Sequence, residues 1–305
     1  MADFLTIGIP AYNEVESIEQ VLNNIMRQSL WKKTPPDRRE IIVCENGSTD
    51  KTYELLEGIA EKVNREHPHQ IRIIKEPEKG KTIAWKRIVK AANKNAREII
   101  FSDADVFHSS NAFLFLKNAL RREKNLEITG AKAITIPRKE KSWILRGSAK
   151  EARRHQLQNP QGFVSGSLYC MRRETAKRME ETMPNDTISE DRHFTNNCAF
   201  RIVEEAQSYP YSPETVLDYV RLRRRFNADR KQREEMGVIE ERIPEKKFSE
   251  KVRSLKGKSL KTNIKRTAKY GLNKFADSKL ADFIFKHSDI WPSLKSTKFK
   301  RRKPM

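Results

Sequence analysis

Two aspartates flank a small residue directly after an apolar run. Asp103-Ala104-Asp105 follows the segment Glu98–Ser102. Two carboxylates at the exit of a buried strand suit a Mg²⁺ or Mn²⁺ ion bridged to a diphosphate, because hard cations take carboxylate and phosphate oxygens. An Asx turn that caps the next helix uses the same residues. The spacing therefore indicates either a metal-bound diphosphate site or a local cap.

The elements that position these residues alternate along the first part of the chain. Strand-like runs are expected at Phe4–Pro10, Glu40–Cys44, Ile71–Lys75, Glu98–Ser102, Ile128–Ile136 and Phe163–Met171. Helix-like patterns are expected at Glu16–Gln28, Asp50–Arg65, Thr82–Asn95 and Lys141–Gln158. Such alternation predicts an α/β fold with a mostly parallel sheet flanked by helices.

Polar clusters stand at the ends of three of these runs, at 10–14, 45–50 and 103–105. The carboxyl ends of parallel strands meet at one edge of a sheet, and ligands of open α/β sheets bind at that edge. We therefore expect the three clusters to lie together and to form a ligand site.

Charge divides the chain into two parts. The formal net charge is +21, which favours polyanionic partners such as nucleic acid, an anionic membrane face or phosphorylated ligands. Residues 227–305 hold 23 Lys and Arg against 10 Asp and Glu, a net +13. This shift predicts a first domain over 1–226 and a basic, mainly helical extension over 227–305.

Several motifs occur in one order from Ile7 to Phe226. They are IGIPAYNE (7–14), IIVCENGSTDKT (41–52), EPEKGKTIAW (76–85), FSDADV (101–106), GFVSGSLYCMRRE (162–174), ISEDRHF (188–194) and RLRRRF (221–226). Together they closely resemble the family 2 glycosyltransferases, which have the GT-A fold. The resemblance implies transfer of a sugar from a nucleotide-diphospho-sugar donor, with Mg²⁺ or Mn²⁺ as cofactor.

The resemblance also assigns donor-side roles. Pro10, Tyr12 and Glu14 match the positions that contact the nucleotide base and ribose. Glu45 stands where the family usually has an aspartate that touches the nucleotide, so the charge is kept on a longer side chain. Lys81 can place a cation near the donor, although a solvated loop charge is an equal interpretation. Asn46, Gly47, Ser48 and Asp50 are expected to serve local structure.

The remaining roles concern the metal, the acceptor and the diphosphate. Asp103 is the expected ribose contact and shares the metal site with Asp105, the expected metal ligand. Asp191 is the expected base that takes the acceptor hydroxyl proton, with Glu190 orienting it. An acidic first turn of a helix is the alternative for this pair.

Arg223 and Arg225 resemble the arginines that close over the diphosphate in polymer-forming members. Leu222 and Phe226 replace the glutamine and tryptophan of that motif, which favours addition of a single sugar. His108, His155 and His193 are candidate further ligands or acceptor contacts, with an ordinary surface or interface role as the alternative.

The resulting expectation is an inverting hexosyl- or N-acetylhexosaminyl-transferase that acts on a hydroxyl of a glycan or lipid-linked acceptor. The sequence has neither a signal-peptide pattern nor a run of about 20 apolar residues. A cytoplasmic protein is therefore expected, held as a peripheral protein on the membrane face by its basic extension. Two alternatives stay open, namely a glycosyltransferase acting on nucleic acid and a non-catalytic basic binding protein on a GT-A scaffold.

Overall fold

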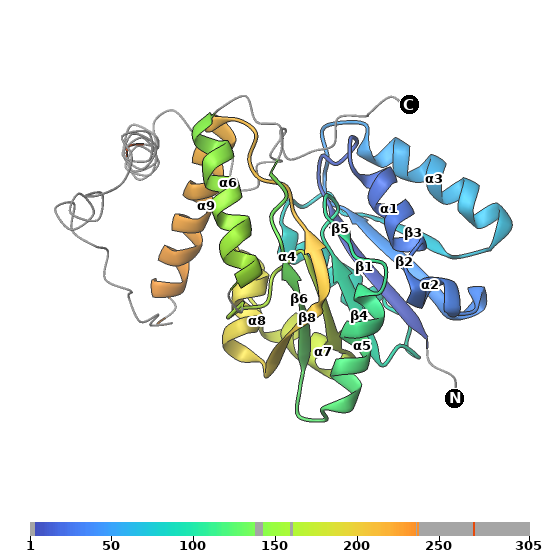
Figure 1. The fold of residues 1–305 in the computed structure, drawn as a ribbon. Coiled ribbons are helices and arrows are strands. Elements are labelled where there is room, and N and C mark those ends of the chain that lie inside the picture. Colours follow the sequence, from blue (N-terminus) through green and yellow to red (C-terminus); the bar gives the residue numbers. More distant parts are fainter. Residues whose placement is uncertain (1–3, 138–142, 159–160, 236, 238–270, 272–305) are drawn as a thin grey trace.

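The chain folds around one curled sheet with helices on both faces (Figure 1). A computed structural model describes residues 4–137, 143–158, 161–235, 237 and 271. Most of the predicted basic extension, including the tail Lys298–Lys303, lies outside the described residues. No helix in the described ranges is long and apolar enough to cross a bilayer.

Within those ranges the sheet has eight strands in the order β3-β2-β1-β4-β7-β6-β8-β5. Their bounds are β1 Leu5–Ala11, β2 Arg39–Glu45, β3 Ile71–Lys75, β4 Glu98–Ser102, β5 Phe107–His108, β6 Ile128–Ala133, β7 Leu168–Arg172 and β8 Phe200–Tyr209. The pairings β3-β2, β2-β1, β1-β4 and β6-β8 are parallel. Only β7 and β5 run against the other strands of this sheet, so the expected mostly parallel sheet is confirmed.

The helices connect these strands in the expected alternation. Their bounds are α1 Ile18–Met26, α2 Ser29–Lys33, the 3₁₀ helix η1 Pro36–Arg38, α3 Thr52–Glu66, α4 Lys81–Ala91, α5 Ala112–Arg122, α6 Trp143–Gln158, α7 Arg173–Thr182, α8 Glu190–Asn197 and α9 Val216–Glu235. The predicted strands at 71–75 and 98–102 are confirmed at their exact bounds. The predicted helix at 141–158 corresponds to α6, and its first two residues are outside the described ranges.

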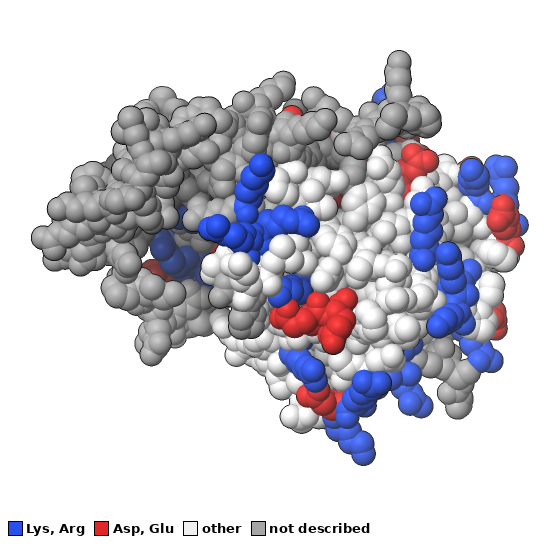
Figure 2. Space-filling model, viewed as in Figure 1, with Lys and Arg blue, Asp and Glu red and all other residues white. Residues whose placement is uncertain are grey.

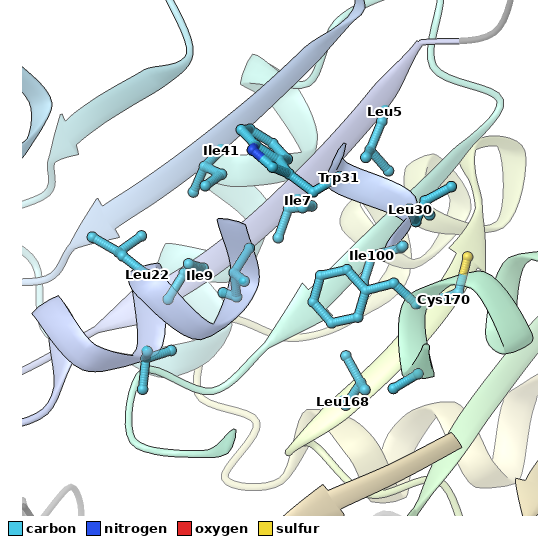
Figure 3. Packing of buried hydrophobic residues seen from close by; sticks show 14 of the residues in the cluster. Leu5, Ile7, Ile9, Leu22, Leu30, Trp31, Ile41, Ile100, Leu168 and Cys170 are labelled. Atoms are coloured by element: carbon cyan, nitrogen blue, oxygen red, sulfur yellow. The ribbon is translucent and has the colours of Figure 1, made fainter. Parts of the chain in front are cut away.

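Each face of the sheet carries its own apolar cluster. Residues of β1 alternate, so that Leu5, Ile7 and Ile9 pack with α1, α2, α3 and α5 (Figure 3). On the opposite face, the aromatic side chains of Trp85 and Phe101 stack at 5.3 Å between α4 and β4. These two clusters pack against both faces of the sheet and so fix where its strand ends lie.

Gly8 shows how closely α4 approaches the sheet. A Cβ at this position of β1 would lie 2.5 Å from Cγ2 of Ile88 and 3.1 Å from the ring of Phe101. Because a Cβ here would overlap the side chain of Ile88, glycine allows α4 to pack this closely against the strand. The start of α4, Lys81, is thereby set at the carboxyl edge of the sheet.

The predicted domain boundary near residue 227 falls inside α9. This helix runs without a break from Val216 to Glu235, so the last residues of the first domain and the first residues of the extension share one helix. The division at this point stays a prediction, because most of 227–305 is not described.

Candidate active site

The three polar clusters meet at the carboxyl edge of the sheet, as expected. In the parallel pairings β1-β2 and β1-β4, Ala11 lies opposite Glu45 and Gly8 lies opposite Phe101. The loops that follow β1, β2 and β4 are therefore neighbours in space. The amino end of α4 joins them, since its first residue is Lys81.

Asn46 joins three of these loops. Its backbone N–H donates to the carbonyl of Ala11 at 2.9 Å, and its side-chain carbonyl accepts the N–H of Gly80 at 2.6 Å. Its amide nitrogen donates to the carbonyl of Glu78. Asn46 is fully buried, so its structural role agrees with the expectation.

The acidic residues of the first two motifs also make local contacts. Glu45 is 2% exposed, and its Oε1 accepts the N–H of Ser48 at 2.5 Å. The carboxylate of Glu14 accepts a hydrogen bond from the hydroxyl of Ser17 at 2.5 Å. The backbone N–H of Glu14 donates to the hydroxyl of Thr52 at 2.7 Å. These bonds position both carboxylates at the loop ends.

Tyr12 and Pro10 occupy the same edge. Pro10 is a buried residue of β1, next to its last residue. Tyr12 is half-buried, and Nζ of Lys79 lies 3.3 Å from its hydroxyl and 5.3 Å from its ring centroid. The loop before α4 and the loop after β1 therefore touch through this pair.

Lys81 joins the motif at 101–106 to the motif at 188–194. Its Nζ lies 2.7 Å from Oδ1 of Asp103 and 2.6 Å from Oε1 of Glu190. The lysine side chain is 16% exposed and that of Glu190 only 2%. A solvated loop charge is therefore excluded for Lys81, which is the central cation of a buried ion-paired cluster.

The charges of this cluster depend on one another. Burial raises the pKa of Asp103, the Lys81 ammonium opposes that rise, and the carboxylate of Asp105 adds to it. Burial likewise raises the pKa of Glu190 against the opposing effect of Lys81. Burial alone would lower the pKa of Lys81, but the two carboxylates raise it above its ordinary value. Lys81 therefore stays protonated, and its charge offsets the repulsion among the carboxylates.

Asp191 is the second residue of α8, beside Glu190. The acidic first turn proposed as an alternative is thus present, and the same residues also line the cluster. Oδ2 of Asp191 accepts the N–H of Gly166 at 3.0 Å. A side chain at Gly166 would have its Cβ 2.9 Å from Nζ of Lys81 and 3.2 Å from Oε1 of Glu190. A larger residue here would therefore displace the charged ends of these side chains.

Gly166 received no role from the sequence, although it lies within a recognised motif. The missing signal is spatial, since nothing along the chain reveals that Lys81 and Glu190 converge on this position. The same holds for Ser167, whose carbonyl accepts the N–H of Asp103 at 3.3 Å and joins the loop after β4 to the loop before β7.

Asp103 and Asp105 suit a divalent cation that is completed by ligand phosphates. Both are half-buried and follow β4. Among the described residues there is no group of three or more His, Cys, Asp or Glu that could hold a metal by itself. Mg²⁺ and Mn²⁺ do not need such a group, since one or two carboxylates and phosphate oxygens suffice. The donor set therefore fits the expected ion.

The arginines of α9 approach the cluster to different degrees. Arg225 lies close enough to oppose the raised pKa values of both Lys81 and Asp103. Arg223 is half-buried on the same helix. Phe226, which replaces the family tryptophan, is 51% exposed.

His108 does not occupy the surface. It is 4% exposed, and its Nε2 lies 2.8 Å from the hydroxyl oxygen of Ser102. That hydroxyl donates to the carbonyl of Asp103 at 2.9 Å, so Nε2 must carry the proton that it shares with Ser102. Burial lowers the pKa of His108 to about 3. The residue is a neutral support for the loop after β4. His155 is exposed on α6 and His193 is half-buried on α8.

Comparison with known proteins gives a consistent result. The family model described as glycosyl transferase family 2 matches residues 6–179. No curated protein matches the chain. Among solved structures, the mannosyltransferase PcManGT from Pyrobaculum calidifontis, in complex with GDP-Man and Mn²⁺, has a TM-score of 0.55 at 21% identity. That match covers 74% of this chain and 61% of the mannosyltransferase.

Two further structures share the fold at lower identity. S. aureus TarS 1-349 in complex with UDP has a TM-score of 0.50 at 14% identity, with 72% of this chain and 63% of that chain covered. GalNAc-T7 with UDP, GalNAc and Mn²⁺ has the same TM-score and identity, with 72% and 47% covered. The chain therefore spans less than two thirds of each of these proteins, and the likeness establishes the expected GT-A fold.

Proposed function

Because this chain belongs to glycosyl transferase family 2, we propose that it transfers a single hexosyl or N-acetylhexosaminyl group from a nucleotide-diphospho-sugar to an acceptor hydroxyl with inversion. The observation that carries the proposal is the pair of contacts made by Lys81. One ammonium binds Asp103 on the donor side and Glu190 on the acceptor side, at 2.7 and 2.6 Å. A transferase needs both substrates at one point, and this contact joins their two motifs.

The nucleotide is proposed to bind over the loops that follow β1 and β2. Pro10, Tyr12, Glu14 and Glu45 line these loop ends, and the contacts of Asn46 hold the loops together. The mannosyltransferase with GDP-Man and TarS with UDP support a nucleotide in this fold. The nucleotide-sugar panel described below identifies the base and the sugar of the donor.

The diphosphate is proposed to lie beside Asp103 and Asp105. Both carboxylates would hold a Mg²⁺ or Mn²⁺ ion, which neutralises charge on the leaving diphosphate when it is bound. Arg225 adds a fixed positive charge near Asp103, and Arg223 on the same helix is proposed to face the donor with it. The structures of the mannosyltransferase and of GalNAc-T7, which both contain Mn²⁺, support this choice of ion.

The acceptor is proposed to meet Asp191. As the acceptor oxygen attacks the anomeric carbon, the bond from that carbon to the diphosphate breaks and the hydroxyl proton passes to the Asp191 carboxylate. The N–H of Gly166 fixes that carboxylate at 3.0 Å. Glu190 acts as a positioning residue, because it is buried against Lys81 rather than open to an acceptor. One displacement of this kind inverts the configuration.

The acceptor class is proposed to be a glycan or a lipid-linked glycan at the cytoplasmic membrane face, in polysaccharide biosynthesis. Lys and Arg side chains gather over α6 on the face shown in Figure 2, where Lys150, Arg153 and Arg154 belong to that helix. A net charge of +21 supports attraction to anionic lipid, worth about 1 kcal/mol for each well-placed cation. The same charge would suit a nucleic acid acceptor, so vesicle and duplex DNA binding must be compared at rising salt.

The test measures thermal unfolding of the whole chain with each nucleotide sugar of a panel, in the presence of Mn²⁺ or Mg²⁺. The correct donor at about 100 times its dissociation constant should add about 2.7 kcal/mol of stability. Asp105→Asn should lose this gain, whereas Asp186→Asn, at an exposed aspartate outside the cluster, should keep it. A panel in which no nucleotide sugar stabilises the protein with either ion would instead favour the non-catalytic binding protein.

A further inference from the structure

The segment at 185–189 leads directly into α8, which begins with Glu190 and Asp191. The segment belongs to no helix or strand, so its backbone groups have no partners in a regular element. How it is held decides where α8 begins, and with it the place of the proposed base. The contacts of this segment therefore bear on the acceptor side of the site.

Gln232 of α9 binds two backbone groups of this segment at once. Its Oε1 accepts the N–H of Ile188 at 2.9 Å, and its Nε2 donates to the backbone carbonyl of Asp186 at 2.8 Å. Gln232 is half-buried, so water competes less for both bonds than it would at an exposed side chain. Because Ile188 comes two residues before Glu190, these bonds fix the backbone just ahead of α8.

Two side chains of α4 hold the same segment. The hydroxyl of Thr82 donates to the carbonyl of Thr187 at 2.8 Å, and Nζ of Lys86 donates to Oδ1 of Asn185 at 2.8 Å. These bonds tie the segment to the helix whose first residue binds Glu190. The segment is thus held from α4 through its side chains and one carbonyl, and from α9 through two backbone groups.

Gln232 shares one face of α9 with Arg225 and Asp229. The three residues are four and three positions apart, a spacing that places side chains on one face of a helix. Burial raises the pKa of Asp103 and the charge of Arg225 opposes this rise, so Arg225 lies near the donor side. Asp229 is 4% exposed and pairs with Arg233 at 2.9 Å. One polar face of α9 therefore reaches from the carboxylate cluster to the segment before α8.

We propose that Gln232 is a positioning residue for the transfer reaction, which holds the segment before α8 so that the carboxylate of Asp191 meets the acceptor. The inference rests on the proposed function, in which Asp191 is the base. A shift in the start of α8 would also move this carboxylate relative to the N–H of Gly166, which it accepts at 3.0 Å. The catalytic unit then extends past residue 226, because Arg225 and Gln232 act from one continuous helix.

The first measurement follows the N–H of Ile188 by hydrogen exchange in the full chain, which needs no substrate. Gln232→Met removes both bonds and keeps a side chain of similar length. We expect this N–H to exchange at least about fivefold faster in the variant, because the hydrogen bond that protects it is lost. Lys231→Met, at the exposed neighbouring residue, places the same side chain on α9 and should leave the exchange unchanged. Equal exchange rates in the two variants would overturn the proposal.

The second measurement is the release of nucleotide from each nucleotide sugar of the panel, with Mn²⁺ present and water as the acceptor. Gln232→Met should lower kcat by about tenfold or more, because a misplacement of about 1 Å can cost about 100-fold. The KM for the donor should stay within about threefold, since the donor motifs are unaltered. Gln232→Glu keeps the oxygen that accepts from Ile188 and should recover part of the loss. A kcat of Gln232→Met equal to that of Lys231→Met, or a KM that rises as far as kcat falls, would contradict a positioning role.

The same assays separate this inference from the proposed function. If the unaltered chain released no nucleotide from any donor, the proposed function would fail, and a role of Gln232 in transfer would fail with it. If the unaltered chain turned the donor over and Asp191→Asn did not, the proposed function would stand. In that case a Gln232→Met chain with full turnover would refute this inference alone.

Discussion

Gly166 offers the sharpest test of how the candidate active site is assembled. In Gly166→Ala, the new methyl group would lie 2.9 Å from Nζ of Lys81, 3.2 Å from Oε1 of Glu190 and 3.4 Å from Oδ2 of Asp191. Non-bonded atoms prefer about 3.5–4.0 Å, so Nζ must move by at least about 0.5 Å. We expect a shift of Nζ by this amount to lengthen at least one of its two short contacts, which are 2.6 and 2.7 Å long.

The expected loss is larger in turnover than in stability. A weakened charge-assisted hydrogen bond costs about 1–3 kcal/mol, and a misplacement of about 1 Å near the reacting atoms can cost about 100-fold. We therefore expect kcat/KM to fall by about 10- to 100-fold, which corresponds to about 1.4–2.8 kcal/mol. The unfolding midpoint should fall by less than about 8 °C, because the displaced atoms are ends of flexible side chains.

The assay compares three forms of the full chain with the donor found in the nucleotide-sugar panel. Gly162→Ala is the matched control, because its Cβ would meet nothing within 4 Å in the same loop. It should retain full turnover and stability. If Gly166→Ala kept more than about half of the activity, the contacts around Lys81 would not limit the reaction and the reasoning would be refuted.

Three further predictions concern single side chains. Asp105→Asn should lower metal-dependent turnover by about 100-fold or more while the unfolding midpoint stays within a few degrees, and turnover without such a loss would remove Asp105 from the metal site. Asp191→Asn should lower transfer by about 100- to 10,000-fold yet leave the donor dissociation constant within about threefold, and a parallel loss of both would make Asp191 a donor ligand. His108 has its pKa lowered to about 3, so the folded chain stays neutral there while the unfolded chain takes up a proton below about pH 6.5. The free energy of unfolding of the unaltered chain should therefore fall by about 2 kcal/mol more than that of His108→Gln as the pH falls from 7 to 5. Denaturant unfolding at the two pH values measures this difference. If both chains lost the same free energy, His108 would be charged or exposed in the folded chain.

The positions of several strands along the chain followed from local patterns, whereas their order in the sheet did not. The β-branched runs at 71–75 and 98–102 match their strands. Short alternating or continuous apolar runs are typical of strands that are buried on one face or on both faces of a sheet. β8 was not predicted. Its sequence carries Glu204 and Glu205 at a register shift against β6, between Ala131 and Lys132, and this irregularity breaks the period of two.

The candidate site divides in the same way. The sequence alone indicated Asp103, Asp105, Glu190 and Asp191, since motif order and position after a strand are properties of the chain. It left open whether Lys81 was a solvated loop charge, because its partners are far away along the chain. Only the packing of α4 and α8 against the sheet brought Lys81 to both carboxylates.

Other features had no sequence signal at all. The convergence of three charged side chains on Gly166 is a property of the folded chain, because Lys81 comes from α4 whereas Glu190 and Asp191 come from α8. Local sequence determines which segments become strands and helices, because periodicity and turn residues act over a few neighbours. Which distant side chains then touch depends on how the elements pack, and that is decided only when the whole core is assembled.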